Sequence, residues 1–292
     1  MHGHGYANGA GTIVNAIAIW KGAAFCIDLA TTADVELDEC AGGAGNAVAG
    51  GEGDDRITGR IENADTADTA LITRCVSLVL DRFGYRCDGV VTTRSEIPIA
   101  RGLKSSSAAA NATVLATLDA IGETLPLLEV VSMGVRAALD VGVTITGAFD
   151  DACASALGGI VITDNRNMEL VERIEYESDV LIYLPEEKAF TADTDVTRSK
   201  AVAPLVEMAY QLALDHDFEN AMTLNGLLYC AALGFDTEIV MSALKLGVSG
   251  VSLSGTGSAY TALVGRDQIQ ELKCCWGGMG GSVIQTRIVN KL

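Results

Sequence analysis

Residues 96–112 read EIPIARGLKSSSAAANA, in which an extended segment passes through a glycine and a lysine into three serines and a run of alanines. Alanine is the strongest helix former, so the stretch predicts a helix that begins at the serines. The first turn of a helix carries unpaired N–H groups and partial positive charge, which suit an anion. One serine is enough for a cap, and neither Gly102 nor Lys104 adds to one. The stretch therefore indicates a polyphosphate site beside the simpler interpretation as a capped helix.

The glycine-rich loop is not a Walker A motif. That motif requires G-x-x-x-x-G-K-[ST], and here Leu103 occupies the position of the second glycine. The fold that surrounds the loop must therefore differ from that of the P-loop proteins.

The composition describes a globular chain with a strong negative charge. The chain has 292 residues, of which 49% are hydrophobic, enough for two domains or one large one. The net charge of −18 argues against a nucleic-acid-binding protein, which needs a basic surface. No apolar run reaches the length of about 18 residues typical of a membrane helix, and residues 1–15 lack the features of a secretory signal. We therefore expect a cytoplasmic protein.

The cysteine and histidine content bears on metal sites and disulfides. None of the cysteines forms a CxxC pair, and the chain has three histidines, so a structural zinc site is not expected. Several cysteines lie in apolar runs, which favours buried free thiols over disulfides. The eight cysteines are Cys26, Cys40, Cys75, Cys87, Cys153, Cys230, Cys274 and Cys275.

Hydrophobic periodicity predicts an α+β protein. Two paired extended runs are expected within 12–39, and further strands at 87–98, 159–165, 168–176, 179–185, 248–253, 258–265 and 282–289. Helices are expected at 66–83, 106–121, 127–141, 150–158 and 267–276, with more between 199 and 246. A glycine-rich connection covers 41–53, and a domain boundary is expected between 165 and 198.

Three motifs together resemble those of the GHMP small-molecule kinases. Residues 98–106 resemble the phosphate loop of that superfamily, and the SGTGS turn at 254–258 resembles a turn that packs there beside the phosphate loop and the substrate. Asp151 is followed seven residues later by Gly158, as in the family's catalytic helix. Asp140 precedes Asp151 by eleven residues, where the mevalonate-type kinases carry an acidic Mg²⁺ ligand. The order and spacing of these motifs carry the resemblance.

Within the superfamily the chain resembles the archaeal-type shikimate kinases. The resemblance rests on GAGTIVNAIA, GLKSSSAAANA, TGAFDDACAS, AMTLNGLLYCAALGF and SLSGTGSAYTALV, and it extends over essentially the whole chain. It implies a GHMP kinase fold with an N-terminal domain like ribosomal protein S5 domain 2 (residues 1–165) and a ferredoxin-like C-terminal domain (166–292). It also implies ATP-dependent phosphorylation of the 3-hydroxyl of shikimate in aromatic amino-acid biosynthesis, with Mg²⁺, by a monomer or homodimer.

The resemblance also assigns roles to individual residues. Asp151 would accept the hydroxyl proton or hold the hydroxyl in line, while Asp150 would cap the helix or tune the pKa of its neighbour, or be the catalytic group itself. Ser106 and Asp140 would bind Mg²⁺, although Asp140 also fits a surface carboxylate at a helix end. The ATP-binding residues would be Arg101, Gly102, Leu103, Lys104, Ser105, Ser106 and Ser107.

Substrate recognition would require a cation for the carboxylate of shikimate. Arg198, in a polar segment, is the first candidate, and an exposed loop arginine is the alternative. The hydroxyls would be met by polar residues or by the C-terminal turn, for which the candidates are Asn8, Asn15, Asn225, Gly255, Thr256 and Gly257.

One departure from the mevalonate-type pattern concerns a lysine. Those kinases carry a lysine in their N-terminal motif near the catalytic aspartate, whereas ANGAGTIVN has none and Lys21 lies too far along the chain. This puts a lysine-assisted mechanism in doubt. The alternatives are another GHMP kinase, acting on homoserine, pantoate or mevalonate, and a GHMP-fold protein that binds small molecules without catalysis.

Overall fold

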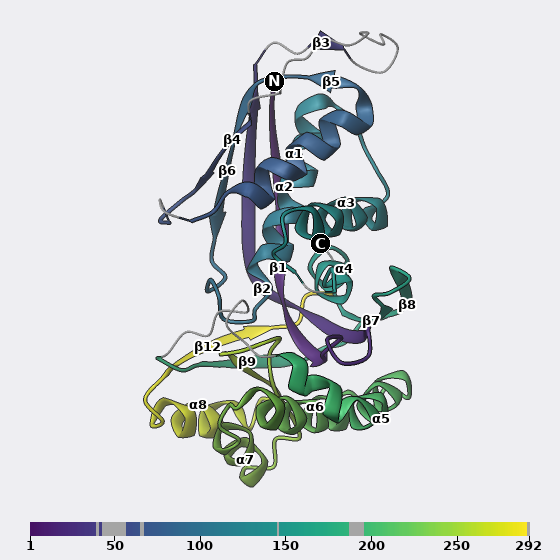
Figure 1. Ribbon diagram of the computed structural model, residues 1–292. Helices are drawn as coiled ribbons and strands as arrows, with labels where there is room; N and C mark the ends of the chain where they lie inside the picture. The colour runs from purple at the N-terminus through teal and green to yellow at the C-terminus, as the bar shows by residue number, and fades with distance from the viewer. Residues whose placement is uncertain (39–40, 43–56, 65–66, 145, 187–195, 291–292) are drawn as a thin grey trace.

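The computed structural model describes residues 1–38, 41–42, 57–64, 67–144, 146–186 and 196–290, and two sheets organise them (Figure 1). The first sheet has the order β4-β6-β2-β7-β8, with β1 also paired with β2. Its strands are β1 (His2–Val14), β2 (Lys21–Leu37), β4 (Ile57–Ile61), β6 (Gly89–Ser95), β7 (Ile160–Asp164) and β8 (Glu169–Ile174). A separate short pair joins β3 (Ala41–Gly42) to β5 (Tyr85–Arg86).

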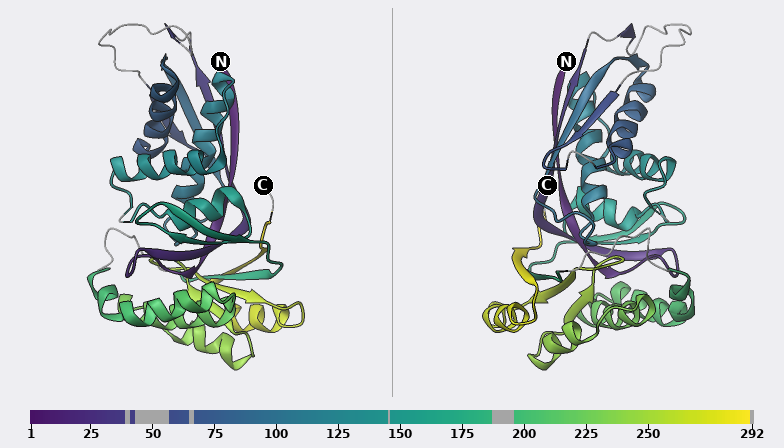
Figure 2. Two further views of the ribbon diagram at one scale, coloured as in Figure 1. Left: turned by 90° about the vertical axis from the view of Figure 1, so that its right-hand side faces the viewer. Right: turned by 60° about the vertical axis from the view of Figure 1, so that its left-hand side comes forward.

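Four helices cover one face of the first sheet (Figures 1 and 2). They are α1 (Ala70–Phe83), α2 (Ser105–Ile121), α3 (Leu127–Asp140) and α4 (Phe149–Leu157). The central helix, α2, contacts β1 and β2 and also the other three helices. It can be buried on most sides because its small alanine side chains allow neighbours to approach closely.

Glycines in β1 provide the close approach between this strand and α2. A Cβ atom at Gly3 would lie 2.2 Å from the carbonyl oxygen of Ala116, and one at Gly5 would lie 2.0 Å from that of Ala112. Only glycine fits at these two positions, so the glycine-rich N-terminus and the alanine run of α2 form one packing interface. Residues 2–11 of β1 were absent from the predicted strands because glycine has low strand propensity.

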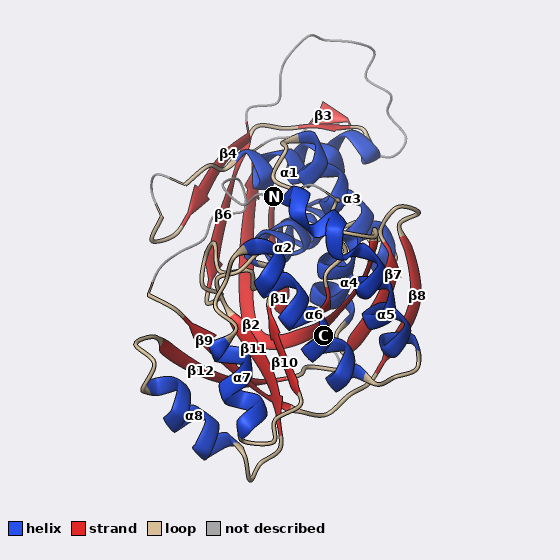
Figure 3. Ribbon diagram, turned by 60° about the horizontal axis from the view of Figure 1, so that its bottom comes forward, coloured by secondary structure: helices blue, strands red, loops and turns tan. Residues whose placement is uncertain are grey.

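The second sheet has the order β10-β11-β9-β12 and is antiparallel throughout (Figure 3). Its strands are β9 (Asp179–Leu184), β10 (Gly250–Leu253), β11 (Tyr260–Val264) and β12 (Ser282–Arg287). A 3-10 helix, η2 (Val196–Val202), precedes α5 (Ala203–Leu214), α6 (Phe218–Leu233) and α7 (Glu238–Lys245), and α8 (Ile269–Gly277) follows β11. Strands and helix-containing crossovers thus alternate as βαββαβ, the ferredoxin-like arrangement that was expected.

The chain passes from the first sheet to the second between β8 and β9. The predicted domain boundary at residue 165 falls between β7 and β8, which pair with each other in the first sheet, so the change of sheet comes later, between Ile174 and Asp179. The two paired runs predicted within 12–39 are instead the end of β1 and the single strand β2, because Lys21–Leu37 pairs with residues 2–14 and does not fold back on itself. The remaining expected helices and strands are confirmed to within a few residues, while β3, β4 and β5 were not predicted. The glycine-rich connection predicted at 41–53 lies almost entirely outside the described residues.

The cysteines depart from the expected pattern at one position. Cys87 is disulfide-bonded, so the prediction of free thiols is wrong there. An isolated cysteine between two short strands has no local pattern that marks it as bonded. The six described cysteines that remain are free, and four of them, Cys26, Cys75, Cys153 and Cys230, are buried. Among the helices of the described ranges, none is long and apolar enough to cross a membrane.

Candidate active site

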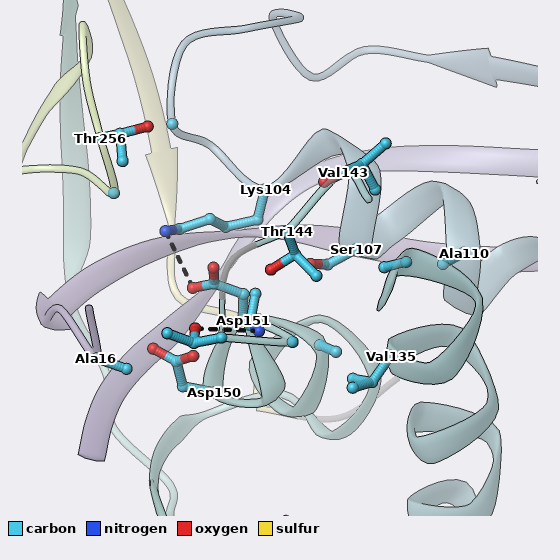
Figure 4. Close-up of a pocket in the computed structure, with 18 of the residues that line it drawn as sticks. Ala16, Lys104, Ser107, Ala110, Val135, Val143, Thr144, Asp150, Asp151 and Thr256 are labelled. Atoms are coloured by element: carbon cyan, nitrogen blue, oxygen red, sulfur yellow. Dashed lines mark hydrogen bonds and ion pairs between the residues drawn. The ribbon is translucent and has the colours of Figure 1, made fainter. Parts of the chain in front are cut away.

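A cavity of about 170 Å³ lies where the two helix starts, α2 and α4, face the end of β1 and the turn between β10 and β11 (Figure 4). The wall includes the three serines of α2, the two aspartates of α4, and Gly255 and Thr256 of the turn. Segments far apart in sequence thus share one site: Nδ2 of Asn15 donates to the carbonyl oxygen of Gly255, 240 residues later, at 2.8 Å.

The N-terminus of α2 is open toward the cavity. Lys104 is the N-cap residue, with a left-handed backbone (φ 65°), and no side chain caps the helix. The three serines, Ser105, Ser106 and Ser107, line the cavity, and none of their hydroxyls hydrogen-bonds to another described residue. The first-turn amides and three hydroxyls are therefore available to an anion, which favours the phosphate-site interpretation over the capped helix.

The loop before α2 is locked to the C-terminal turn. A Cβ atom at Gly102 (φ 78°) would lie 2.0 Å from the carbonyl oxygen of Ser254, so only glycine allows this approach. Oγ of Ser254 donates to the carbonyl oxygen of Gly102 at 2.8 Å, and the amide of Ala259 donates to that of Arg101 at 2.9 Å. The loop before α2 and the SGTGS turn are therefore packed together and hydrogen-bonded, as the family resemblance implied.

Two residues predicted to bind ATP have their side chains elsewhere. Nη1 of Arg101 donates to the carbonyl oxygen of Pro185 at 2.6 Å and to Oγ of Ser258 at 2.9 Å, which ties the loop to the second sheet. Leu103 is 1% exposed and packs in the core, and its carbonyl oxygen accepts from the amide of Ala10. Neither side chain lines the cavity, so both anchor the loop.

Asp151 and Lys104 form an ion pair at the centre of the site. Nζ of Lys104 lies 3.0 Å from Oδ1 of Asp151, and both side chains are largely buried. Burial and the neighbouring carboxylate of Asp150 raise the pKa of Asp151 to about 7, while Lys104 acts in the opposite direction. Asp151 is therefore poised to exchange a proton near neutral pH.

Asp150 lines the cavity but has different partners. It is 4% exposed, and its Oδ1 accepts a hydrogen bond from Nδ2 of Asn165 at 2.7 Å. Both aspartates begin α4, whose N-cap residue, Ala148, has a left-handed backbone and no side-chain cap. The first turn of α4 thus places two carboxylates in the wall of one cavity, and of the two only Asp151 forms an ion pair with a described residue, Lys104.

The asparagines expected to meet the substrate are used within the protein. The backbone amide of Asn15 donates to Oδ1 of Asn225 at 2.9 Å, and Nδ2 of Asn225 donates to Oγ of Ser252 at 3.0 Å. Asn15 lines the cavity; Asn225 lies behind it. Nδ2 of Asn8 donates to the carbonyl oxygen of Ile27 at 2.7 Å, within the first sheet and away from the cavity wall. These residues join β1 to its neighbours and so shape the site.

Three further residues lie away from the cavity wall. Asp140 ends α3, and its carboxylate lies 2.7 Å from the guanidinium group of Arg74, on the surface. The eleven-residue spacing to Asp151 therefore does not bring the two carboxylates together, because α3 ends with this side chain turned toward α1. Arg198 is exposed on η2, and Gly257 lies in the turn beside the Phe235 ring.

Sequence reasoning missed several groups that the structure brings to the site. Thr12, Thr144 and Thr146 line the cavity, and Thr12 accepts a hydrogen bond from the amide of Gly255 at 2.9 Å. A single threonine in a loop or strand carries no pattern that marks it. A lysine next to Asp151 was sought in the N-terminal motif, whereas the structure places Lys104, from the loop before α2, beside this carboxylate.

The donor set suits Mg²⁺ better than a metal held by protein alone. No group of three or more His, Cys, Asp or Glu in the described ranges could hold a metal ion. Mg²⁺ is usually held by one or two protein oxygens together with substrate phosphates and water. The serine hydroxyls provide such oxygens beside the open helix terminus, so the residues present fit this ion.

Comparison with known proteins places this cavity in a family context. Residues 70–159 match the model of the GHMP kinases N-terminal domain. The chain is 62% identical to a shikimate kinase of Methanosarcina mazei over 99% of this chain and 95% of the relative. It is 46% identical to one of Halobacterium salinarum over 98% and 96%.

Solved structures support the fold at much lower identity. The mevalonate kinase of Methanococcus jannaschii superposes with a TM-score of 0.76 at 16% identity, covering 99% of each chain. A homoserine kinase from Cytophaga hutchinsonii gives 0.74 at 15% identity, covering 99% of this chain and 95% of that one. These likenesses concern the fold alone.

Proposed function

The chain belongs to the archaeal shikimate kinases of the GHMP superfamily, and on this basis we propose that it transfers the γ-phosphoryl group of ATP to the 3-hydroxyl of shikimate. The products are shikimate 3-phosphate and ADP. The same proposal places the enzyme in aromatic amino-acid biosynthesis, in the cytoplasm. The observation that carries it is the Lys104–Asp151 pair, 3.0 Å apart, beside the uncapped start of α2.

The reaction needs one bond to form and one to break. The 3-hydroxyl oxygen bonds to the γ-phosphorus, the bond from this phosphorus to the β,γ-bridging oxygen breaks, and the hydroxyl proton passes to Asp151. A carboxylate with a pKa of about 7 accepts that proton more readily than an exposed aspartate. The protein mainly contributes positioning and charge neutralisation.

Lys104 links the two halves of this chemistry. It is the N-cap residue of the helix whose amides and serines face the phosphates, and its ammonium group pairs with Asp151. From this position it keeps part of the Asp151 population ionised and places a positive charge next to the transferred phosphoryl group. Gly102 and Ser105 to Ser107 bind the phosphates through backbone amides and hydroxyls.

Mg²⁺ would neutralise charge on the phosphate oxygens when bound, and the Ser106 hydroxyl would hold it with phosphate and water as further ligands. Asp140 has less support as a ligand because its carboxylate pairs with Arg74. Among the described wall residues Lys104 is the cationic one, so Arg198 remains our candidate for the shikimate carboxylate on chemical grounds alone.

An ADP-release assay over shikimate, homoserine, mevalonate and pantoate tests the proposal. We expect turnover with shikimate, and phosphorus NMR of the product should place the new phosphate on the 3-hydroxyl. Turnover of another acceptor and none of shikimate would overturn it. Asp151→Asn should lower kcat by about 10²- to 10⁴-fold with a nearly unchanged KM for ATP, and full activity of this variant would refute the catalytic assignment.

A further inference from the structure

The mechanism above leaves one buried carboxylate of the cavity without a role. Asp150 is 4% exposed and lines the cavity next to Asp151. No cation among the described residues forms an ion pair with it, whereas Asp151 has Lys104. A buried carboxylate without a cation is costly unless hydrogen bonds satisfy it. The carboxylate of Asp150 therefore needs hydrogen-bond donors.

One oxygen of Asp150 is fixed by an oriented amide. Oδ1 of Asn165 accepts from Oγ1 of Thr163 at 2.8 Å and from the backbone amide of Asp150 at 3.2 Å. With its oxygen engaged twice, Asn165 must present Nδ2 to Asp150, and this group donates to Oδ1 at 2.7 Å. The short chain Thr163–Asn165–Asp150 thus sets the orientation of the carboxylate.

The other carboxylate oxygen of Asp150, Oδ2, lies beside a glycine and has no hydrogen-bond partner in the described part of the protein. A Cβ atom at Gly22 would lie 2.4 Å from it, so β2 carries a glycine where a side chain would displace the carboxylate. Figure 4 shows the carboxylate turned toward Ala16, with Asp151 between it and Lys104. Oδ2 therefore lies close to Gly22 and Ala16, and Ala16 is part of the cavity wall.

Two adjacent carboxylates with different partners suit two adjacent hydroxyls. An ionised carboxylate only accepts hydrogen bonds, so the missing partner of Oδ2 must be a donor such as a hydroxyl. In shikimate the carbon that carries the reacting 3-hydroxyl has one hydroxylated neighbour, carbon 4. We propose that Asp150 accepts a hydrogen bond from the 4-hydroxyl of shikimate, and that Asn165 is the positioning residue for this contact. The inference rests on the proposed function and makes Asp150 a specificity residue.

The first test compares shikimate with 4-deoxyshikimate on the unaltered enzyme. A hydrogen bond to a buried charged group that loses its partner should lower kcat/KM roughly 10- to 100-fold. Asp150→Ala should suffer a similar loss with shikimate and should discriminate little between the two substrates. An unaltered enzyme that uses both equally well, or an Asp150→Ala variant that retains the full discrimination, would overturn the proposal.

The second test separates positioning by Asn165 from a merely structural role. Asn165→Ala should raise the KM for shikimate more than it lowers kcat, reduce discrimination against 4-deoxyshikimate, and leave the KM for ATP unchanged. Asn111→Ala is the matched control, because Nδ2 of this buried asparagine donates to the carbonyl oxygen of Ala152 in the same helix at 2.9 Å. The control should lower thermal stability and keep the discrimination. Equal discrimination by both variants would refute the role of Asn165.

These experiments distinguish a failure of the proposed function from a failure of the role proposed for Asp150. If the unaltered enzyme phosphorylates no shikimate, the proposed function itself fails. If it phosphorylates shikimate and the 4-deoxy analogue equally, the function stands and only the role of Asp150 fails. The comparison on the unaltered enzyme needs no variant, so it does not depend on whether Asp150→Ala folds.

Discussion

Nζ of Lys104 lies 3.0 Å from Oδ1 of Asp151, so the N-cap residue of α2 also contacts the carboxylate that we propose as the catalytic base. Lys104 adopts a left-handed backbone (φ 65°), which costs about 1 kcal/mol for a residue other than glycine. Gly255 leaves room for its ammonium group, since a Cβ atom there would lie 2.8 Å from Nζ. The left-handed backbone and the space at Gly255 together bring the ammonium group to Asp151.

Lys104→Met should shift the pH dependence of activity. Lys104 lowers the pKa of Asp151 against the stronger effects of burial and of Asp150, so removing the ammonium group should raise that pKa above about 7. The base must be ionised to act, and the acid limb of kcat/KM for shikimate should therefore move to higher pH. A pH–rate profile measures this shift, because kcat/KM reports the free enzyme.

Lys104→Arg provides the control for this experiment, because it keeps the positive charge. Its acid limb should remain near that of the unaltered enzyme, even if the different shape of the guanidinium group lowers the rate. An acid limb that Lys104→Met leaves unchanged would show that the ammonium group does not act on Asp151.

Asp151→Asn should change how stability depends on pH. The pKa of Asp151 is 3.8 in an exposed reference state and about 7 in the folded protein, so between these values the folded state binds a proton that the unfolded state has released. The stabilisation is fully present below about pH 4 and is lost as the pH rises to about 7, at up to 1.4 kcal/mol per pH unit. The variant lacks this dependence.

Urea denaturation of both proteins at about pH 5, 6, 7 and 8 measures the effect. The difference in unfolding free energy, unaltered protein minus Asp151→Asn, should fall across the series and level off near its upper end. A difference that stays constant would mean that Asp151 titrates normally in the folded protein.

Patterns that repeat along the chain were predictable from sequence, and contacts between distant segments were not. The alanine run of α2 and the glycines that follow α1 and α2 carry their structure locally, through helix propensity and left-handed helix ends. Of β1, only residues 12–14 were predicted, because the glycines at its start have low strand propensity. These glycines are explained by the close contact with α2, about a hundred residues away in sequence.

The site shows the same division. Asp151 and the serines stand in motifs whose spacing is fixed within one helix start. The partner of Asp151 is Lys104, and their contact depends on how the N-termini of α2 and α4 are placed in the fold. No spacing within the sequence predicts that contact. For Asp140 the sequence spacing was matched to that of related kinases, but the spacing alone does not determine where the carboxylate lies. At the end of α3 this carboxylate pairs with Arg74 and is not part of the cavity wall.

Gly102→Ala should be far more disruptive than Gly122→Ala. Both glycines have left-handed backbones, with φ values of 78° and 69°. A Cβ atom at Gly122 meets nothing within 4 Å, so this substitution should cost only about 1 kcal/mol for the backbone. At Gly102 the Cβ atom would lie 2.0 Å from the carbonyl oxygen of Ser254, and the loop or the turn must move.

We therefore expect Gly102→Ala to lose more than about 2 kcal/mol of unfolding free energy and to raise the KM for ATP. Gly122→Ala should leave the KM unchanged. Chemical denaturation and steady-state kinetics on the two variants make the comparison. Equal losses would indicate that the contact between the phosphate loop and the C-terminal turn contributes nothing beyond backbone strain.

Ser106→Ala should raise the Mg²⁺ concentration needed for half-maximal activity. Ser106 lies in the first turn of α2, lines the cavity and makes no side-chain hydrogen bond within the described part of the chain, so its removal breaks no internal contact. If its hydroxyl is a Mg²⁺ ligand, the alanine variant must replace it with water, and the deficit should shrink at saturating Mg²⁺. Titration of activity with Mg²⁺ at fixed ATP measures this directly.

Ser132→Ala, which removes a hydroxyl that donates to the carbonyl oxygen of Leu128 on α3, is the control and should follow the unaltered enzyme. A Ser106→Ala titration that coincides with both, while Ser105→Ala or Ser107→Ala is displaced, would assign the ligand to a neighbouring serine instead.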